Sequence, residues 1–323
     1  MKRFLMVMLC LFPAALFAQQ DAIYSQYLFN QLLINPAYAG STETLNMNFL
    51  SRNQWTGITG APTTQSALVD GAFGKAKKIG LGISFLNDKA GLENQTGVFM
   101  NYAYRLITGP KSRLSMGLGV GLTQYMLNGN DAVVDDISDP NFLRKEIYFT
   151  PDARAGVYYT SPGFFAGFSV TNLLTHVLNG SANSKTVILP YTHFFLTAGG
   201  IFGKTEQLKF KPSVMLRDDP SGMGNLDFNA LFTIKEQLTL GASYRMGVNV
   251  WNKVDQGNAR AQQNALIAMV SVFFAKQINL GYAYDYSLSQ LNALSSGTHE
   301  ISLGFILGRR SGWGTIKSPK PVQ

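Results

Sequence analysis

The feature that most constrains the fold of this chain is a period-two alternation of apolar residues with small or polar ones. The clearest run is 114–123, L-S-M-G-L-G-V-G-L-T, and comparable runs occur at 79–85, 238–247 and 278–286. Successive side chains of a β-strand point to opposite faces, so this period indicates strands rather than helices. Each strand is therefore expected to have one face in an apolar medium and the other in polar surroundings.

The alternation recurs often enough to predict an even number of strands, fourteen. Their expected ranges are 43–52, 64–73, 78–87, 95–107, 112–127, 150–160, 163–174, 191–202, 206–217, 224–234, 236–249, 262–275, 277–287 and 298–308. The connections between them are expected to alternate strictly between short and long. The short ones are 74–77, 108–111, 161–162, 203–205, 235 and 276, and the long ones include 53–63, 128–149, 175–190, 250–261 and 288–297. Tight periplasmic turns and longer extracellular loops are typical of outer-membrane barrels.

These patterns predict an all-β fold in one domain, a transmembrane antiparallel β-barrel of fourteen strands covering residues 43–308. A secreted soluble β-sandwich also alternates apolar and polar positions and is the competing fold. The strand count, the alternation of connection lengths and the many strands of ten or more residues favour the barrel. No apolar stretch after the first 18 residues approaches the roughly 20 residues that a transmembrane helix needs.

The N-terminal residues 1–18 have the composition of a secretory signal peptide. Lys2 and Arg3 precede the apolar run 4–17, and Ala18 is a small residue at which cleavage is expected. Cys10, the one cysteine, falls inside this leader, so the mature chain is expected to contain neither disulfides nor thiolate metal sites. Residues 19–42 then form an N-terminal periplasmic or plug segment, and 309–323 form a polar C-terminal tail.

Charge and motif content argue against chemistry and against nucleic acid. The formal net charge of +8 suggests contact with anionic surfaces or acidic partners, but no Lys/Arg-rich run indicates nucleic-acid binding. The histidines His176, His193 and His299 lack metal-site spacing, and the aspartates of 131–139 lack the calcium-loop pattern. The glycines of 117–121 lie inside a strand pattern without a following helix, so they are expected to be small lumen-facing residues rather than a phosphate loop. No catalytic, cofactor or metal site is predicted, and no cofactor is expected.

Strand parity also sorts the aromatic and charged residues. Tyrosines near strand ends are candidates for the girdles that meet lipid headgroups, although half of them could equally be ordinary strand packing; they are Tyr102, Tyr104, Tyr125, Tyr148, Tyr158, Tyr159, Tyr244, Tyr282, Tyr284 and Tyr286. Charged residues of the opposite parity should face the lumen, because that face does not touch lipid; they are Arg105, Arg154, Lys209, Lys211, Arg217, Asp227, Arg245 and Asp285.

The block 21–40 behind the leader reads D-A-I-Y-S-Q-Y-L-F-N-Q-L-L-I-N-P-A-Y-A-G. Its residues Ser25, Gln26, Tyr27, Asn30, Asn35, Pro36, Ala37, Ala39 and Gly40 resemble the opening signature of the PorP/SprF family of Bacteroidetes type IX secretion and gliding proteins. Later positions are similar to the same family over essentially the whole mature chain, among them Arg52, Trp55, Pro62 and Asp70.

The resemblance implies an outer-membrane barrel that serves type IX secretion. Members of the family help to deliver or hold particular cargo proteins at the cell surface, often adhesins used in gliding, and some connect the translocation machinery to periplasmic components. The implied partners are that machinery, a secreted surface protein or adhesin, and outer-membrane lipid. The implied function is therefore partner binding without catalysis; the alternative is a passive channel or a hydrophobic-solute transporter of similar architecture.

The opening block also has a physical interpretation of its own. Tyr24, Tyr27 and the run 32–34 are apolar and precede the first strand, so they must be buried somewhere, and Asn35–Pro36 should end any short helix there. The segment is expected either to plug the lumen or periplasmic mouth and dock a partner, or to pack as a strap on the barrel wall. The candidate partner-binding or plug residues are Tyr24, Ser25, Gln26, Tyr27, Phe29, Asn30, Asn35, Pro36, Tyr38 and Gly40, and the further family-motif candidates are Arg52, Trp55, Pro62 and Asp70.

Overall fold

The computed structural model describes residues 25–129, 145–174, 191–203, 207–220, 223–250, 264–274 and 277–307. The predicted leader, Tyr24, most residues of three of the predicted long loops and the C-terminal tail lie outside these ranges.

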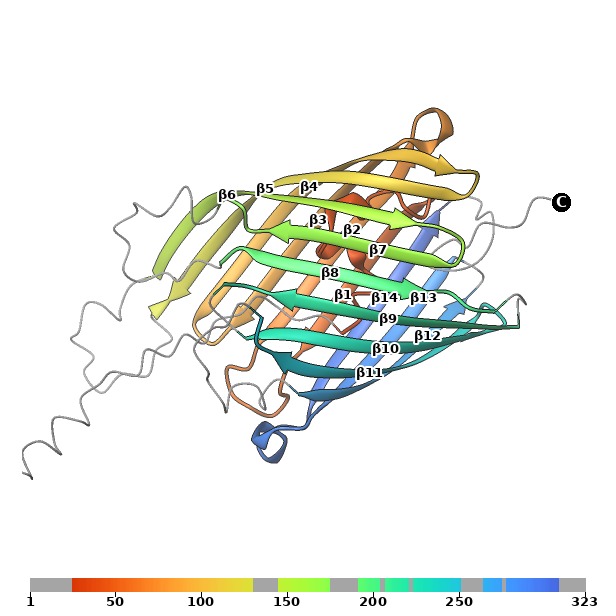
Figure 1. Cartoon of the computed structure of the whole chain (residues 1–323). Helices are drawn as coiled ribbons and strands as arrows, with labels where there is room; N and C mark the ends of the chain where they lie inside the picture. The colour runs from red at the N-terminus through yellow and green to blue at the C-terminus, as the bar shows by residue number, and fades with distance from the viewer. Residues whose placement is uncertain are drawn as a thin grey trace, which may run out of the picture.

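Fourteen strands form one closed antiparallel barrel, as the alternation predicted (Figure 1). The strands are β1 (Leu45–Asn53), β2 (Thr63–Phe73), β3 (Ile79–Ala90), β4 (Glu93–Gly109), β5 (Ser112–Asn128), β6 (Lys145–Thr160), β7 (Phe164–Thr171), β8 (His193–Gly200), β9 (Leu208–Asp218), β10 (Gly224–Ile234), β11 (Leu238–Val248), β12 (Ala265–Phe274), β13 (Ile278–Ser287) and β14 (Thr298–Leu307). Each strand pairs with its neighbours in sequence, and β1 closes the barrel against β14. A single closed sheet excludes the two-sheet sandwich.

The outside of the barrel is apolar and the inside is polar, the reverse of a soluble barrel. On β5, Leu118 and Val120 are 63% and 61% exposed, whereas Ser115 and Thr123 on the other face are buried. Apolar side chains facing outward along a whole strand are stable in hydrocarbon, so this distribution is that of a membrane barrel. No helix in the described ranges is long and apolar enough to cross a bilayer.

Parity places the predicted luminal charges correctly and corrects three tyrosines. Arg105, Asp227 and Arg245 are buried inside the barrel. Tyr125 and Tyr158, expected as candidates for the lipid girdle, are instead only 6% and 1% exposed, because both stand at inward positions of their strands. Tyr148, another of these candidates, also stands at an inward position of β6 and is half-buried. Position along the pleat decides which way a side chain points, whatever its type.

The expected strict alternation of short and long connections is wrong, most clearly at one hairpin. β3 and β4 run further than predicted and are joined by Gly91 and Leu92 alone, with Gly91 at a φ of 57°. A two-residue hairpin needs such positive φ angles, which glycine adopts without a steric penalty. Elsewhere Lys235–Gln237 form a short connection between β10 and β11, and 54–62 and 288–297 form longer connections at the opposite end. The connection 219–223 at that opposite end is, however, shorter than 201–207 at the short-turn end.

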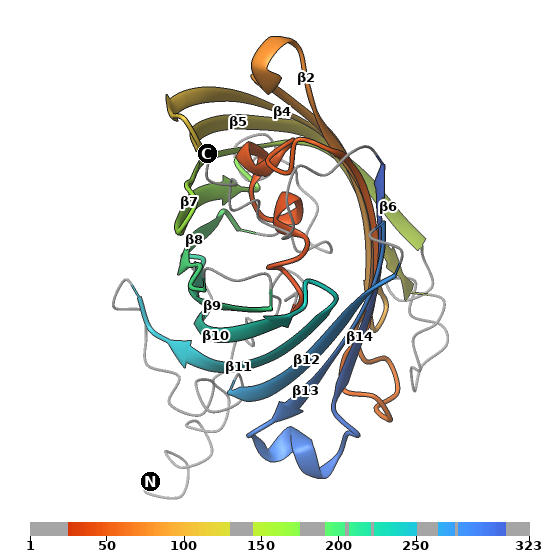
Figure 2. The same cartoon turned by 90° about the vertical axis from the view of Figure 1, so that its right-hand side faces the viewer.

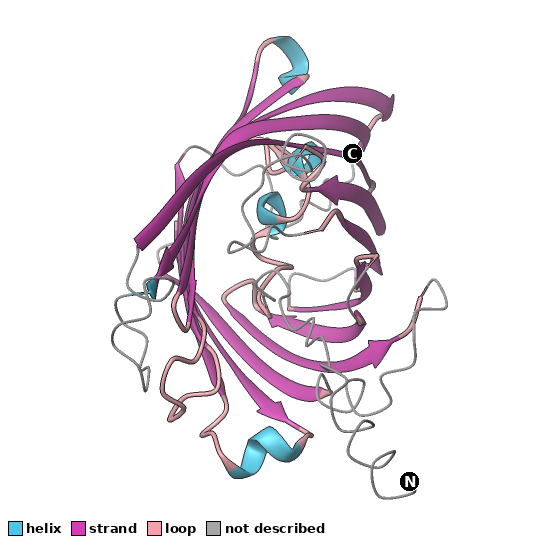
Figure 3. Cartoon of the chain, turned by 90° about the vertical axis from the view of Figure 1, so that its left-hand side faces the viewer, coloured by secondary structure: helices cyan, strands magenta, loops and turns pink. Residues whose placement is uncertain are grey.

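Residues 25–44, here named the luminal segment, run inside the barrel before β1 begins (Figure 2). The segment contains two short 3-10 helices, η2 (Gln31–Leu33) and η3 (Pro36–Tyr38), drawn in cyan within the ring of strands in Figure 3. Its apolar side chains make up much of the molecule's buried apolar cluster. The core of this barrel is therefore partly supplied by a segment that belongs to no strand.

Candidate functional site

The local shape of the luminal segment follows from Asn35 and Pro36. The Asn35 side-chain oxygen accepts a hydrogen bond of 2.9 Å from the Ala37 backbone N–H and so caps η3, and Pro36 occupies the first helical position. Asparagine is a favoured cap, and proline is tolerated there because the first N–H groups of a helix have no intrahelical partner. The same pair keeps η2 and η3 apart, as the sequence predicted. The segment therefore forms two separate helical turns, η2 and η3, within a few residues.

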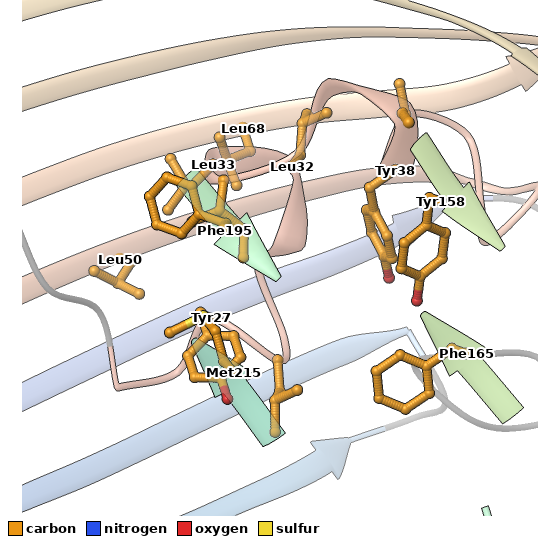
Figure 4. Packing of buried hydrophobic residues seen from close by; sticks show 14 of the residues in the cluster. Tyr27, Leu32, Leu33, Tyr38, Leu50, Leu68, Tyr158, Phe165, Phe195 and Met215 are labelled. Carbon is orange, nitrogen blue, oxygen red and sulfur yellow. The ribbon is translucent and has the colours of Figure 1, made fainter. Parts of the chain in front are cut away.

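Apolar packing holds one side of the segment against the barrel. Tyr27, Leu28 and Leu32 are almost fully buried, together with Leu68 and Met215 of the barrel wall (Figure 4). Tyr38 meets the inward ring of Tyr158 edge-on, with 5.3 Å between the ring centroids (Figure 4). Edge-to-face pairs of this kind are favourable beyond the area they bury. The tyrosine that was expected to be a candidate for the lipid girdle therefore contacts the luminal segment instead.

Inward-facing glycines give the segment room to lie directly on the wall. A Cβ atom at Gly80 would come within 2.0 Å of the Ala39 carbonyl oxygen, and one at Gly117 within 2.2 Å of the Ala37 backbone nitrogen. At Gly156 it would lie 2.3 Å from the Asn35 side-chain oxygen. Glycine inside a strand commonly marks such a close approach of another backbone. The small luminal residues predicted from the sequence thus form the surface on which the segment rests.

One carboxylate, Glu300 on β14, binds the start of the segment. The backbone N–H groups of Ser25 and Gln26 donate to its two oxygens at 2.9 and 2.7 Å, and the Gln26 side chain donates to the Glu300 carbonyl at 3.0 Å. Ser302 on the same strand donates to the Gln26 side-chain oxygen at 2.6 Å. Hydrogen bonds to an ionised acceptor are about twice as strong as neutral ones. Four bonds to one strand therefore fix both residues.

Arg52 on β1 completes this buried network. Its guanidinium donates to Glu300 at 2.9 Å, to the Ser25 hydroxyl at 2.8 Å and to Asp285 on β13 at 2.8 Å. The Ser25 hydroxyl in turn donates to Asp285 at 2.6 Å. Arg245 lies 3.5 Å from the same aspartate. Removing one member of such a network would leave a buried charge without compensation.

The other end of the segment is held by Asp70 on β2. The Gly40 backbone N–H donates to Asp70 at 2.8 Å, and the Asn46 side chain approaches the second carboxylate oxygen at 3.4 Å. Gly40 has a φ of 69°, and a Cβ atom there would lie 2.7 Å from the Gly71 carbonyl. Glycine is therefore required at this position for both reasons. Glu43, just after it, forms a 3.5 Å ion pair with the luminal Arg105.

Between these ends, further bonds join the segment to the opposite wall. The Asn35 side chain donates to the Val157 carbonyl at 3.0 Å. Ser169 and Arg154 donate to the carbonyls of Ile34 and Leu33 at 2.6 and 3.2 Å, respectively. The Asn229 side chain donates to the Tyr27 hydroxyl at 2.6 Å. The segment therefore spans the lumen with polar contacts on both sides.

The site residues predicted from the sequence fall into two groups in the structure. Ser25, Gln26, Tyr27, Asn35, Pro36, Tyr38, Gly40, Arg52 and Asp70 come together inside the barrel, where Asn30 is also buried and Phe29 half-buried. Trp55 and Pro62 lie apart from them in the connection between β1 and β2, where the Trp55 N–H donates to the Thr298 hydroxyl at 3.1 Å and the Pro62 carbonyl accepts from Gln54 at 2.9 Å. Tyr24 lies outside the described residues.

Sequence reasoning missed Glu300, Ser302 and Asn229 as partners of the segment. Each is a single polar residue at an inward strand position with no motif around it. Parity alone indicates that a glutamate in the last strand faces the lumen, and that was the one usable signal for Glu300. Which luminal residue it would bind depends on the path of the segment, which parity does not determine.

The contacts of this site are those by which the barrel wall recognises and binds the luminal segment. Backbone and side-chain donors converge on the Glu300 and Asp70 carboxylates and fix a peptide in place. Among the residues that the structure describes, no three potential metal ligands cluster together. Of the histidines in these ranges, His193 lies 3.6 Å from Asp219, and His299 shares a hydrogen bond with the Tyr282 hydroxyl on the outer wall.

Solved structures similar to this chain are outer-membrane barrels, all at low sequence identity. The outer membrane protein Omp33 of Acinetobacter baumannii has a TM-score of 0.46 and 10% identity, covering 82% of this chain and 100% of that one. A Pseudomonas aeruginosa FadL homologue has a TM-score of 0.45 and 9% identity, covering 84% and 92%. A mutant porin of Rh. blastica has a TM-score of 0.37 and 8% identity, covering 82% and 99%.

The family comparison covers nearly the whole chain, whereas no curated protein matches it significantly. The model of the family described as type IX secretion system membrane protein PorP/SprF matches residues 16–305. That range includes the luminal segment, its partners Arg52, Asp70, Asp285 and Glu300, and nearly all of β14. The chain therefore belongs to the PorP/SprF family of type IX secretion system membrane proteins.

Proposed function

We propose that this protein is a non-enzymatic outer-membrane component of the type IX secretion system, a partner for the secretion or surface attachment of a cargo such as a gliding adhesin. Family membership supports the secretion role. The observation that carries the partner role is the luminal segment, bonded from Ser25 to Gly40 to strands on both sides of the lumen. A lumen occupied by the protein's own segment supports a role in which partners bind to the surfaces of the barrel.

The rim at the short-turn end is the surface that we propose for contact with the machinery. Lys75, Lys78 and Lys235 are exposed on its turns. Its carboxylates Glu43 and Glu236 are already paired, with Arg105 at 3.5 Å and with Lys209 at 2.6 Å. Short turns face the periplasm in outer-membrane barrels, so this basic rim would meet an acidic surface of a periplasmic component.

The luminal segment contributes indirectly to this role. Its side chains from Ser25 to Gly40 are buried, with only Phe29 half-buried, so few of them are available to a partner. We therefore propose that it acts as a plug that keeps the rim and the lumen in one fixed arrangement, and that partners bind to the rim and the outer loops.

Two measurements test the proposal. Affinity capture of the tagged full-length protein from native outer membranes is expected to co-purify type IX components and a secreted surface protein. Capture of neither would contradict it. If the segment plugs the lumen as we propose, purified protein in planar bilayers is expected to be electrically silent. Large steady currents would instead favour the alternative, a passive channel.

A further inference from the structure

Closing the barrel requires the first and last strands to find each other. β1 pairs with β14 along the register from Leu45↔Leu307 to Asn53↔His299. All the other strand pairs of the barrel join strands that follow each other in sequence. Contacts between residues far apart in a chain are slow to form, because the closure entropy is lost before the contacts are made. The β1–β14 seam is thus the one joint of this sheet that local pairing does not specify.

The luminal segment binds both sides of this seam. Arg52 and Glu300 are direct partners across it. The backbone N–H groups of Ser25 and Gln26 occupy the Glu300 oxygens, while the Ser25 hydroxyl accepts from Arg52 at 2.8 Å. Two adjacent residues of the segment therefore recognise the cross-strand pair itself rather than either strand alone.

The path of the chain reinforces this connection. From Gln26, which is bonded to β14, the segment runs to Gly40, which is bonded to Asp70 on β2, and the chain enters β1 at Leu45. Asn46 on β1 contacts the same Asp70. The segment is thus a strap that joins β14 to β1 and β2 from the inside, with covalent continuity into β1.

The outer face of the same strands carries a shallow groove. A groove of about 360 Å³ lies there, lined by Phe49 of β1, Ala67 of β2, Phe85 of β3 and Ile301 and Leu303 of β14. Small or polar side chains, Ala67 and Ser51 among them, occupy positions between the large ones.

We propose that Ser25 and Gln26 act as an internal latch that selects the β1–β14 register and holds the seam closed. The latch recognises the Arg52–Glu300 pair, which forms only when the two strands are in register. A shift by one residue would turn Glu300 toward the outside and leave both backbone N–H groups without their acceptor. This assembly role is independent of any secretion partner.

The test compares two variants that each remove one hydroxyl of the segment. Ser25→Ala removes the bonds to Arg52 and Asp285 at the seam, and Tyr27→Phe removes the bond to Asn229 on β10. Amide hydrogen exchange of the purified, folded protein is measured in β1 and β14 and, for comparison, in β10 and β11. Ser25→Ala is expected to speed exchange at the seam at least about tenfold, because it removes both charge-assisted bonds of the Ser25 hydroxyl, and to leave β10 and β11 unchanged. Tyr27→Phe should leave the seam unchanged.

A stronger variant extends the test to assembly. Glu300→Gln keeps the size of the side chain and removes the charge that Ser25, Gln26 and Arg52 share, so the yield of folded barrel on refolding into detergent should fall several-fold. If it does not fold at all, the milder Ser25→Ala variant still yields the exchange measurement. Equal acceleration at the seam and at β10–β11, equal effects of the two hydroxyl variants, or no change at the seam would overturn the proposal.

Discussion

At the scale of single residues, the barrel depends on positions where the luminal segment leaves no space. Gly117 stands on the inward face of β5, where a methyl group would lie 2.2 Å from the Ala37 backbone nitrogen. Gly117→Ala is therefore expected to lower the free energy of unfolding by about 1–3 kcal/mol, because neither backbone can move away freely. Urea unfolding in detergent measures the change.

Gly163, in the turn between β6 and β7, is the matched control for Gly117. A Cβ atom there would have no neighbour nearer than 3.9 Å, and its φ is not positive. Gly163→Ala is expected to change the stability by less than about 0.5 kcal/mol. Equal unfolding midpoints for the two variants would show that the segment does not press on the wall at Gly117.

A second prediction at this scale concerns Arg52, the cation between Asp285 and Glu300. Arg52→Met keeps most of the side-chain volume but leaves two buried carboxylates facing the same space, which is expected to cost about 3–5 kcal/mol. Lys209→Met breaks the ion pair to Glu236 at the rim, where the lysine side chain is 20% exposed, and should cost no more than about 1 kcal/mol. Similar losses for both variants would contradict a special role for the buried network.

At the scale of elements, η3 is held by one side chain with two functions. Asn35 caps the helix through its oxygen and donates to the Val157 carbonyl through its nitrogen. Asn35→Ala should therefore lower the stability by about 2–3 kcal/mol, the sum of a lost cap and a lost buried bond. Ser289 caps the exposed η6 (Gln290–Ala293) by accepting a bond of 3.3 Å from the Leu291 N–H, and its second bond is to the Ser287 hydroxyl rather than to the backbone of another strand. Ser289→Ala should cost about 0.5–1 kcal/mol, and thermal unfolding that ranks the two the other way would refute this reading.

The strands and the site also show which features could be predicted from the sequence alone. Strand positions were predictable because runs such as 114–123 show period two directly, and all fourteen strands overlap their predicted ranges. β6 begins at Lys145, five residues earlier than predicted. The hairpin at Gly91 was missed because β3 and β4 end in polar residues, where the alternation fades although the pairing continues. In the site, Ser25 and Asn35 could be named from their motif, whereas Glu300 could not. A lone inward glutamate is ordinary in a barrel, and only the path of the luminal segment gives it a partner.

At the scale of the whole molecule, exposed lysines stand at both ends of the barrel, so the two ends can be compared by matched substitutions. Lys78 and Lys235 stand exposed at the short-turn end, and Lys89 and Lys145 stand exposed at the other. If the short-turn rim meets an acidic component of the secretion machinery, Lys78→Glu with Lys235→Glu should reduce capture of that component about tenfold or more, because like charges then face each other. Raising the salt concentration should weaken capture by the unaltered protein, because exposed charges are screened.

Lys89→Glu with Lys145→Glu makes the same change in net charge at the other end and should leave capture of the machinery intact. If both pairs reduced capture equally, net charge rather than the rim would be responsible, and if neither did, the machinery would bind elsewhere on the barrel.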